Sequence, residues 1–175
     1  MKQKELKKHT CCFFGHRKID MDDDLIHNLK KIIEFLITNE KADTFLFGSR
    51  SQFINLCLDI VTEYKKKYPH IKRIYVRAEF PYIDESYTAY LMKSYDNTYY
   101  PKRILNSGKA AYVERNYEMI DNSSYCVIYY DEKYKPPKTK QKNMEDYQPK
   151  SGTKLAFNYS RKKDIKIINL LEIKP

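Results

Sequence analysis

The chain has 175 residues, the length of one domain, and its 42% hydrophobic content supplies enough apolar side chains for a core, which excludes wholesale disorder. No apolar run reaches the ~18 residues that a membrane span needs. The apolar stretch behind the basic N-terminus, residues 11–14, is too short for a signal peptide. We therefore expect a cytoplasmic protein with no membrane partner. Lysine and arginine exceed the acidic residues by 33 − 23 = 10, which favours anionic partners such as nucleotides or nucleic acids.

The four cysteines indicate buried, reduced thiols. They lie at positions 11, 12, 57 and 126 without a Cys-x-x-Cys pair, and no two histidines have the spacing of a zinc finger. Cys11 and Cys12 are neighbours on a predicted strand, so they should face its opposite sides. We therefore predict no metal site, and nothing in the sequence calls for a cofactor.

Short apolar strands alternate with amphipathic helices in the first half of the chain. The strands are predicted at residues 10–14, 44–47 and 71–77. Asp20 is the expected N-cap of the first helix, since the acidic residues 22–24 would then lie at the positive end of the helix. Apolar residues at helical spacing predict the second helix over 53–64, and Lys65–Lys67 suit its negative end.

The second half continues this alternation but contains two irregular stretches. Helices are predicted at residues 84–93, 113–121 and 152–161, and strands at residues 125–130 and 165–170. Residues 96–112 fit neither pattern, although Tyr99–Pro101 favours a loop or an edge strand. Residues 131–150 are rich in lysine, proline and glutamine, which predicts a flexible basic loop. Such a loop is either a mobile lid or a solvated insertion without a role.

The alternation of strands and helices predicts the fold class. Successive strand–helix–strand units form right-handed crossovers, and these build a parallel sheet. We expect a Rossmann-like α/β fold whose mainly parallel sheet has about five to seven strands and carries helices on both faces. Because no linker interrupts the pattern, residues 1–175 are predicted to form one domain.

Three glycine-containing turns follow strands or begin a helix. In a parallel sheet the carboxyl ends of all strands share one edge, so these turns should converge there, where ligands of such sheets bind. Free amides at helix starts and the arginines would attract phosphate, and the hydroxyls would add hydrogen bonds. The candidate ligand-binding residues of the three turns are Gly15, His16, Arg17, Gly48, Ser49, Arg50, Ser151, Gly152 and Thr153.

Other features bear on the kind of ligand. None of the three turns has the spacing of a Walker loop or of the Gly-x-Gly-x-x-Gly motif, which disfavours a P-loop hydrolase or a dinucleotide dehydrogenase. Phe80 and Tyr82 follow the third predicted strand at the same edge, where the ring of either residue stacks on a base or packs in the core. His16 is expected to donate a hydrogen bond rather than act as a base.

The segment Cys11-Cys-Phe-Phe-Gly-His-Arg17 resembles the opening motif of the SLOG superfamily in its YpsA-like branch. The likeness continues at Phe47-Gly48, at Glu114-Arg-Asn-Tyr-Glu-Met-Ile-Asp121 and at Ser151-Gly-Thr153, in the same order as in that branch. The superfamily also includes the LOG phosphoribohydrolases and the DNA-processing DprA proteins. The resemblance implies a nucleotide or nucleotide-derived ligand above the strand ends, and it adds Arg115 and Asn116 to the candidate ligand contacts.

The departures from this family pattern concern catalysis. Ala156 stands where the LOG hydrolases are expected to have a glutamate, and Asn116 stands in the place of a lysine. Cleavage of a glycosidic bond needs a carboxylate to stabilise the positive charge on the ribose or to activate water. The catalytic residues therefore stay unassigned, with Arg115, Glu114 and Glu118 as candidates.

Three hypotheses follow, in this order of preference. The first is a binding protein that senses or sequesters a nucleotide or nucleotide derivative, such as an ADP-ribose-type or cyclic-nucleotide signal. The second is a LOG-like nucleoside monophosphate phosphoribohydrolase. The third is a DprA-like protein that binds single-stranded DNA through Lys65–Lys67 and Lys133–Lys142, and so nucleic acid ranks last among the partners. We also predict a homo-oligomer, since tyrosine-rich helix faces need cover.

Overall fold

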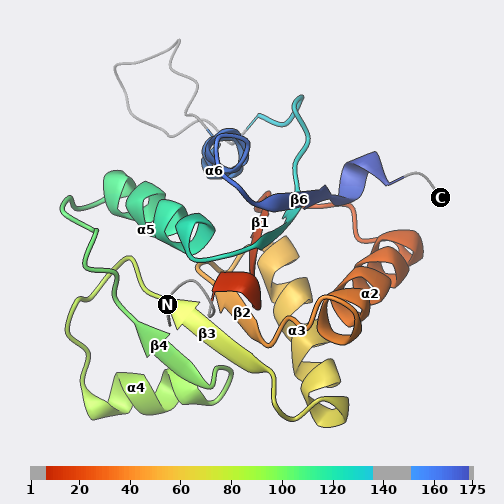
Figure 1. Ribbon diagram of the computed structural model, residues 1–175. Coiled ribbons are helices and arrows are strands. Elements are labelled where there is room, and N and C mark those ends of the chain that lie inside the picture. Colours follow the sequence, from red (N-terminus) through yellow and green to blue (C-terminus); the bar gives the residue numbers. More distant parts are fainter. Residues whose placement is uncertain (1–6, 136–150, 174–175) are drawn as a thin grey trace.

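The computed structural model describes residues 7–135 and 151–173, so most of the predicted basic loop, residues 136–150, lies outside the described part. Its centre is a six-stranded parallel sheet in the order β4-β3-β2-β1-β5-β6 (Figure 1). The strands are β1 (Thr10–Gly15), β2 (Thr44–Phe47), β3 (Lys72–Val76), β4 (Asn97–Tyr99), β5 (Tyr125–Tyr129) and β6 (Lys166–Asn169). The helices are α2 (Asp23–Thr38), α3 (Gln52–Lys67), α4 (Glu85–Met92), α5 (Lys109–Asp121) and α6 (Gly152–Ser160), and a short 3-10 helix, η1 (Leu170–Glu172), follows β6.

Helices cover both faces of the sheet, which confirms the predicted Rossmann-like α/β class. Helices α2 and α3 lie on one face and α5 and α6 on the other (Figure 1). Successive residues of a strand point to opposite faces, and Cys11 packs in the core under α2 and α3 while Cys12 packs in the core under α5 and α6. All four cysteines are buried and free, and burial raises the pKa of the Cys11 and Cys12 thiols.

The strand order places a topological switch point beside the central strand. β1 pairs with β2 on one side and with β5 on the other, where Gly15 lies opposite Tyr129. The chain runs outward from β1 to β4 and then returns to β5 on the other side of β1. Ligands of open parallel sheets bind where the order reverses, outside the carboxyl ends of the strands. This sheet has that position between the ends of β1 and β5.

Some element boundaries differ from the predictions for local reasons. The N-cap of α2 is Asp22, not Asp20, because the Asp22 carboxylate accepts a hydrogen bond of 2.7 Å from the Leu25 amide. Helix α5 starts at Lys109, four residues earlier than expected, after Gly108, whose φ of 61° suits glycine. The unassigned stretch contains β4, a three-residue edge strand next to β3.

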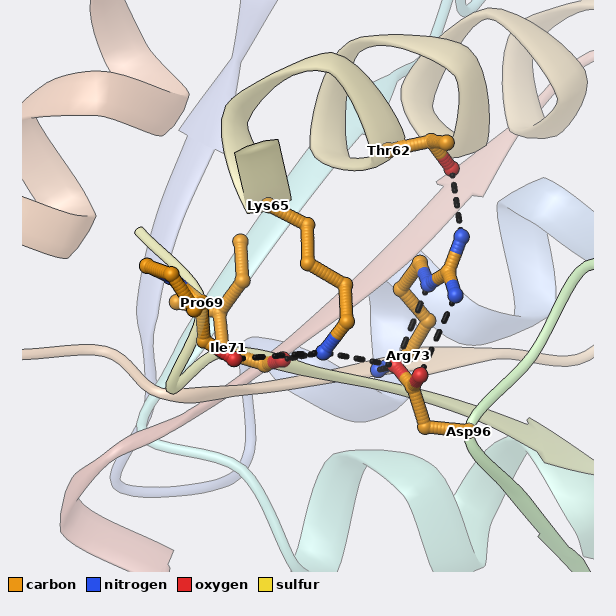
Figure 2. A network of polar contacts seen from close by, with 6 residues as sticks. All are labelled: Thr62, Lys65, Pro69, Ile71, Arg73 and Asp96. Atoms are coloured by element: carbon orange, nitrogen blue, oxygen red, sulfur yellow. Dashed lines mark hydrogen bonds and ion pairs between the residues drawn. The ribbon is translucent and has the colours of Figure 1, made fainter. Parts of the chain in front are cut away.

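A polar network joins the ends of α3, β3 and β4 at the amino edge of the sheet (Figure 2). Arg73 forms hydrogen bonds of 3.1 Å to each carboxylate oxygen of Asp96 and another of 3.1 Å to the Thr62 hydroxyl. Lys65 forms an ion pair of 3.4 Å with Asp96 and donates a hydrogen bond of 2.5 Å to the Ile71 carbonyl. The bonds from Arg73 hold the pKa of Asp96 below its usual range although burial opposes this.

Asp96→Asn should lower the free energy of unfolding by about 1 kcal/mol at pH 7, since it removes charge-assisted hydrogen bonds of a carboxylate that solvent partly screens. The folded pKa of Asp96 is depressed, so its contribution is present above the unfolded pKa and is lost as the pH falls through the folded value. Urea unfolding at pH 7 and pH 3 measures both effects. Asp59→Asn, on the exposed side of α3, is the matched control and should change stability by less than about 0.5 kcal/mol.

Candidate functional site

The three predicted glycine turns lie at the carboxyl edge of the sheet. β1 ends at Gly15 and β2 ends at Phe47, directly before Gly48, on neighbouring parallel strands. Helix α6 begins at Gly152 and connects β5 to the parallel strand β6, so its N-terminus also lies on the carboxyl side. This common edge, formed by the residues after β1, β2, β3 and β5 and by the start of α6, is called the rim below.

Gly15 is required by close packing. A Cβ atom built on Gly15 would overlap the Phe53 ring and lie 2.6 Å from the Phe53 Cβ. Phe53 is completely buried in the first turn of α3, and its ring lies 5.8 Å from the Tyr129 ring at the end of β5. The glycine thus lets the start of α3 approach the end of β1, which brings the Gly48 turn next to the switch point.

Gly48 admits the side chain of Arg115 to the rim. A Cβ on Gly48 would lie 2.7 Å from Arg115 Nε and 2.8 Å from Met119 Sδ. Arg115 Nη1 donates one hydrogen bond to the Gly48 carbonyl and another, of 3.3 Å, to the Val76 carbonyl. Arg115 Nε donates a hydrogen bond of 2.9 Å to the side-chain oxygen of Asn116. Arg115 therefore joins the ends of β2 and β3 from the α5 side of the sheet.

The Arg115 guanidinium is a buried charge that forms no ion pair within the described residues. Its side chain is 3% exposed, and burial lowers its pKa to about 10, so it stays protonated at neutral pH. Nearby Tyr75 and Glu79 oppose this lowering of the Arg115 pKa. Because burial raises the pKa of Tyr75, its phenol is uncharged at neutral pH, and Glu79 is the acidic side chain of the two. Within the described residues, the hydrogen bonds of the Arg115 side chain come from Nε and Nη1, and none comes from Nη2.

His16 lies at the switch point and is 2% exposed. Its Nε2 accepts a hydrogen bond of 2.9 Å from the Asp131 amide after β5, and its ring stacks on the Tyr134 ring at 3.9 Å. Burial lowers the pKa of His16. Because Nε2 accepts a hydrogen bond, the neutral ring carries its proton on Nδ1, and this donor has no partner within the described residues. The structure thus places His16 as a hydrogen-bonded link between β1 and β5.

The remaining polar residues of the turns lie at the helix starts. Ser51 caps α3 by accepting from the Ile54 amide at 3.3 Å, and Ser151 caps α6 by accepting from the Lys154 amide at 3.4 Å. Arg17 is exposed, and so is Arg50, which also contacts α4. Ser49 is half-buried and Thr153 is buried, while a Cβ on Gly152 would meet no atom within 4 Å.

The acidic candidates for catalysis are held by other groups. Glu114 accepts hydrogen bonds from the Leu105 and Asn106 amides at 3.1 and 3.2 Å, and from the Asn106 side chain at 2.6 Å. Glu118 accepts a hydrogen bond of 2.9 Å from the side-chain amide of Asn122, the residue that follows α5. Both carboxylates therefore stabilise the ends and neighbouring loop of α5.

A groove of about 420 Å³ lies beside the end of β5 and was not predicted. Its walls include Tyr130, whose ring stacks on the Phe157 ring at 4.5 Å, together with Lys154, Arg161 and Glu172. In the sequence these residues of α6 and η1 match an ordinary solvated helix face. Only the folded chain brings them next to the residues that follow β5.

Fold and rim define the class: a Rossmann-like α/β protein whose carboxyl edge combines glycine turns, two capped helix starts and a buried arginine. No protein-family model matches the chain, and no curated protein is significantly similar to it. In the described part of the chain, no helix is both long and apolar enough to cross a membrane. No group of three or more His, Cys, Asp or Glu among the described residues is arranged to hold a metal ion.

Proposed function

We propose that the protein binds a nucleotide or nucleotide derivative at the rim, to sense or sequester it. The observation that carries this proposal is Arg115, a nearly buried guanidinium without a carboxylate partner among the described residues, placed where β2 and β3 end. Burying a charge costs free energy unless an opposite charge or hydrogen bonds compensate. An anionic group of a ligand would supply the missing charge and an acceptor for Nη2.

Further rim groups suit a phosphate. The amides at the starts of α3 and α6 carry the positive ends of the helix dipoles, and both starts follow a glycine turn. Arg17 and Arg50 are exposed at the same edge and can form charge-assisted hydrogen bonds with phosphate oxygens. The resemblance to the YpsA-like branch of the SLOG superfamily, noted from the sequence, agrees with such a ligand.

We place binding ahead of glycosidic cleavage because the acidic candidates are engaged elsewhere. Glu114 is held by the loop at residues 105–106 and Glu118 by Asn122. A LOG-like phosphoribohydrolase stays the alternative, and it requires that free base appears when the protein is incubated with nucleoside monophosphates. Release of base that disappears in Arg115→Ala, checked against the stability of that variant, would favour the enzyme.

The nucleic-acid alternative has less support. In the lysine cluster at the end of α3, Lys65 is held by Asp96 and the Ile71 carbonyl, and Lys67 pairs with Glu34 at 2.6 Å. These contacts lie at the amino edge, away from the rim. The second predicted cluster, Lys133–Lys142, falls mostly outside the described residues.

A thermal-unfolding panel tests the proposal with AMP, cyclic AMP and ADP-ribose, and with ribose 5-phosphate as the ligand without a base. At a concentration near 100 times Kd, a bound ligand should raise Tm by roughly 5–10 °C. Arg17→Ala and Arg50→Ala should reduce this rise, because each removes a cation from the rim. Lys31→Ala, exposed on α2, is the matched control and should leave the rise unchanged. Unchanged Tm values throughout the panel would contradict the proposal.

Two other predictions from the sequence also stay proposals. We infer a homo-oligomer from the number of tyrosines on helix faces, and a cytoplasmic location from the four free, buried cysteines. Light scattering of the purified chain would measure the first, and fractionation of the source cells would address the second.

A further inference from the structure

A row of aromatic rings leads away from the Gly48 turn. Arg50 Nη1 donates a hydrogen bond of 2.9 Å to the Tyr90 hydroxyl, and the guanidinium lies 5.3 Å from the centre of the Tyr90 ring. Tyr90 stacks on Tyr87 with ring centres 6.0 Å apart, and Tyr87 meets Phe80 edge-on at 6.0 Å. The aromatic row is Phe80, Tyr87 and Tyr90, and Arg50 joins it to the turn before α3.

Two of the three rings of the aromatic row, Phe80 and Tyr90, are exposed, whereas Tyr87 between them is half-buried against the core. Phe80 is 58% exposed and Tyr90 is 49% exposed. Large apolar side chains gathered on a surface commonly mark a binding site. The neighbouring Tyr82, a predicted ligand contact, is 94% exposed and therefore does not pack in the core.

The backbone at Phe80 holds this ring outward at an energetic cost. Phe80 has a φ of 55°, a conformation that bulky residues rarely adopt. Arg77 Nη1 keeps the loop in place by donating hydrogen bonds of 2.5 Å to the Phe80 carbonyl and 3.4 Å to the Pro81 carbonyl. Such strain persists only where surrounding contacts enforce it, and it concentrates at functional sites.

We infer that the aromatic row is the stacking surface for the base of the bound nucleotide, and this inference rests on the function proposed above. The flat faces of nucleobases stack on aromatic side chains, and Arg50 stands between the rings and the positive end of α3. A phosphate held at the Gly48 turn would therefore place the attached base toward Tyr90 and Phe80. The ligand class is a purine or pyrimidine nucleotide rather than a sugar phosphate.

The test compares AMP with ribose 5-phosphate on the whole chain by isothermal titration calorimetry. Phe80→Leu keeps an apolar side chain but removes the aromatic face, so it should weaken AMP binding about tenfold and leave ribose 5-phosphate unaffected. Phe80→Tyr keeps an aromatic face and should bind AMP as tightly as the wild-type protein does. Phe35→Leu, at an exposed phenylalanine of α2, is the matched control and should change neither Kd.

The outcomes separate this inference from the proposed function. If the wild-type protein binds AMP and Phe80→Leu and Tyr90→Leu bind it equally well, the stacking surface is overturned and the phosphate site stands. If none of AMP, cyclic AMP, ADP-ribose and ribose 5-phosphate binds the wild-type protein, both proposals fail. If a single-stranded oligonucleotide binds but AMP does not, the aromatic row serves nucleic acid, which also overturns the inference. Equal thermal stability of the variants shows that a lost affinity is not a loss of fold.

Discussion

Gly15→Ala should lower the free energy of unfolding by about 3 kcal/mol, since the new methyl group would overlap the buried Phe53 ring. The Phe53 side chain has no exposed surface and its ring contacts Tyr129, so it cannot move aside without disturbing the start of α3. Urea denaturation followed by circular dichroism measures the loss. A destabilisation below about 1 kcal/mol would show that α3 does not approach β1 as closely as described.

Two further variants connect the effect to this contact. In a Phe53→Ala background the cost of Gly15→Ala should fall but not vanish, because the Phe53 Cβ, 2.6 Å from the added methyl, is still present. Gly152→Ala is the matched control at the start of α6, where the added Cβ meets nothing within 4 Å. It should stabilise the protein by about 0.5 kcal/mol by restricting the unfolded chain.

Arg115→Ala should cost about 3 kcal/mol or more of unfolding free energy. The substitution leaves the Gly48 and Val76 carbonyls without the guanidinium that bonds them, and it opens space below the ends of β2 and β3. Chemical denaturation provides the measurement. Arg17→Ala, at the exposed arginine of the same rim, should change stability by less than about 0.5 kcal/mol.

The Arg115 result also bears on the ligand. If the guanidinium needs an external anion, saturating AMP should stabilise the wild-type protein but not Arg115→Lys, which keeps the charge and loses the planar fork. Equal stabilisation of both proteins would mean that Arg115 only ties β2 to β3. That outcome would remove the main support for an anion site at the Gly48 turn.

Local sequence patterns were sufficient for the strands and their faces. Apolar runs such as Thr10–Phe14 and Tyr125–Tyr130 predicted buried parallel strands, and these became β1 and β5 with helices on both sides. Strand polarity then implied the shared edge of the glycine turns. Boundaries were less certain, because the competition between Asp20 and Asp22 as N-cap depends on which carboxylate reaches an amide, and this is a matter of local geometry.

The candidate site was only partly accessible from the sequence. Arg115 entered through a resemblance, although its spacing offered a signal: Ala111, Arg115 and Met119 recur every four residues and all lie on the buried face of α5. An arginine within an apolar stripe indicates a buried charge that is compensated by hydrogen-bond acceptors or by an opposite charge. Its partners, the carbonyls of Gly48 and Val76, lie 67 and 39 residues away, and nothing in the sequence links either of them to Arg115.

The sequence by itself determined the class of fold and the edge of the sheet where the glycine turns meet, because hydrophobic periodicity and strand direction are local properties. Tertiary structure alone decided that Gly15 accommodates Phe53, that Glu114 and Glu118 accept hydrogen bonds from neighbours of α5, and that Phe80 faces solvent. These arrangements arise when helices pack on the sheet and bring side chains from distant segments into contact. Steric fit and hydrogen-bond geometry then choose among partners that the linear sequence leaves equivalent.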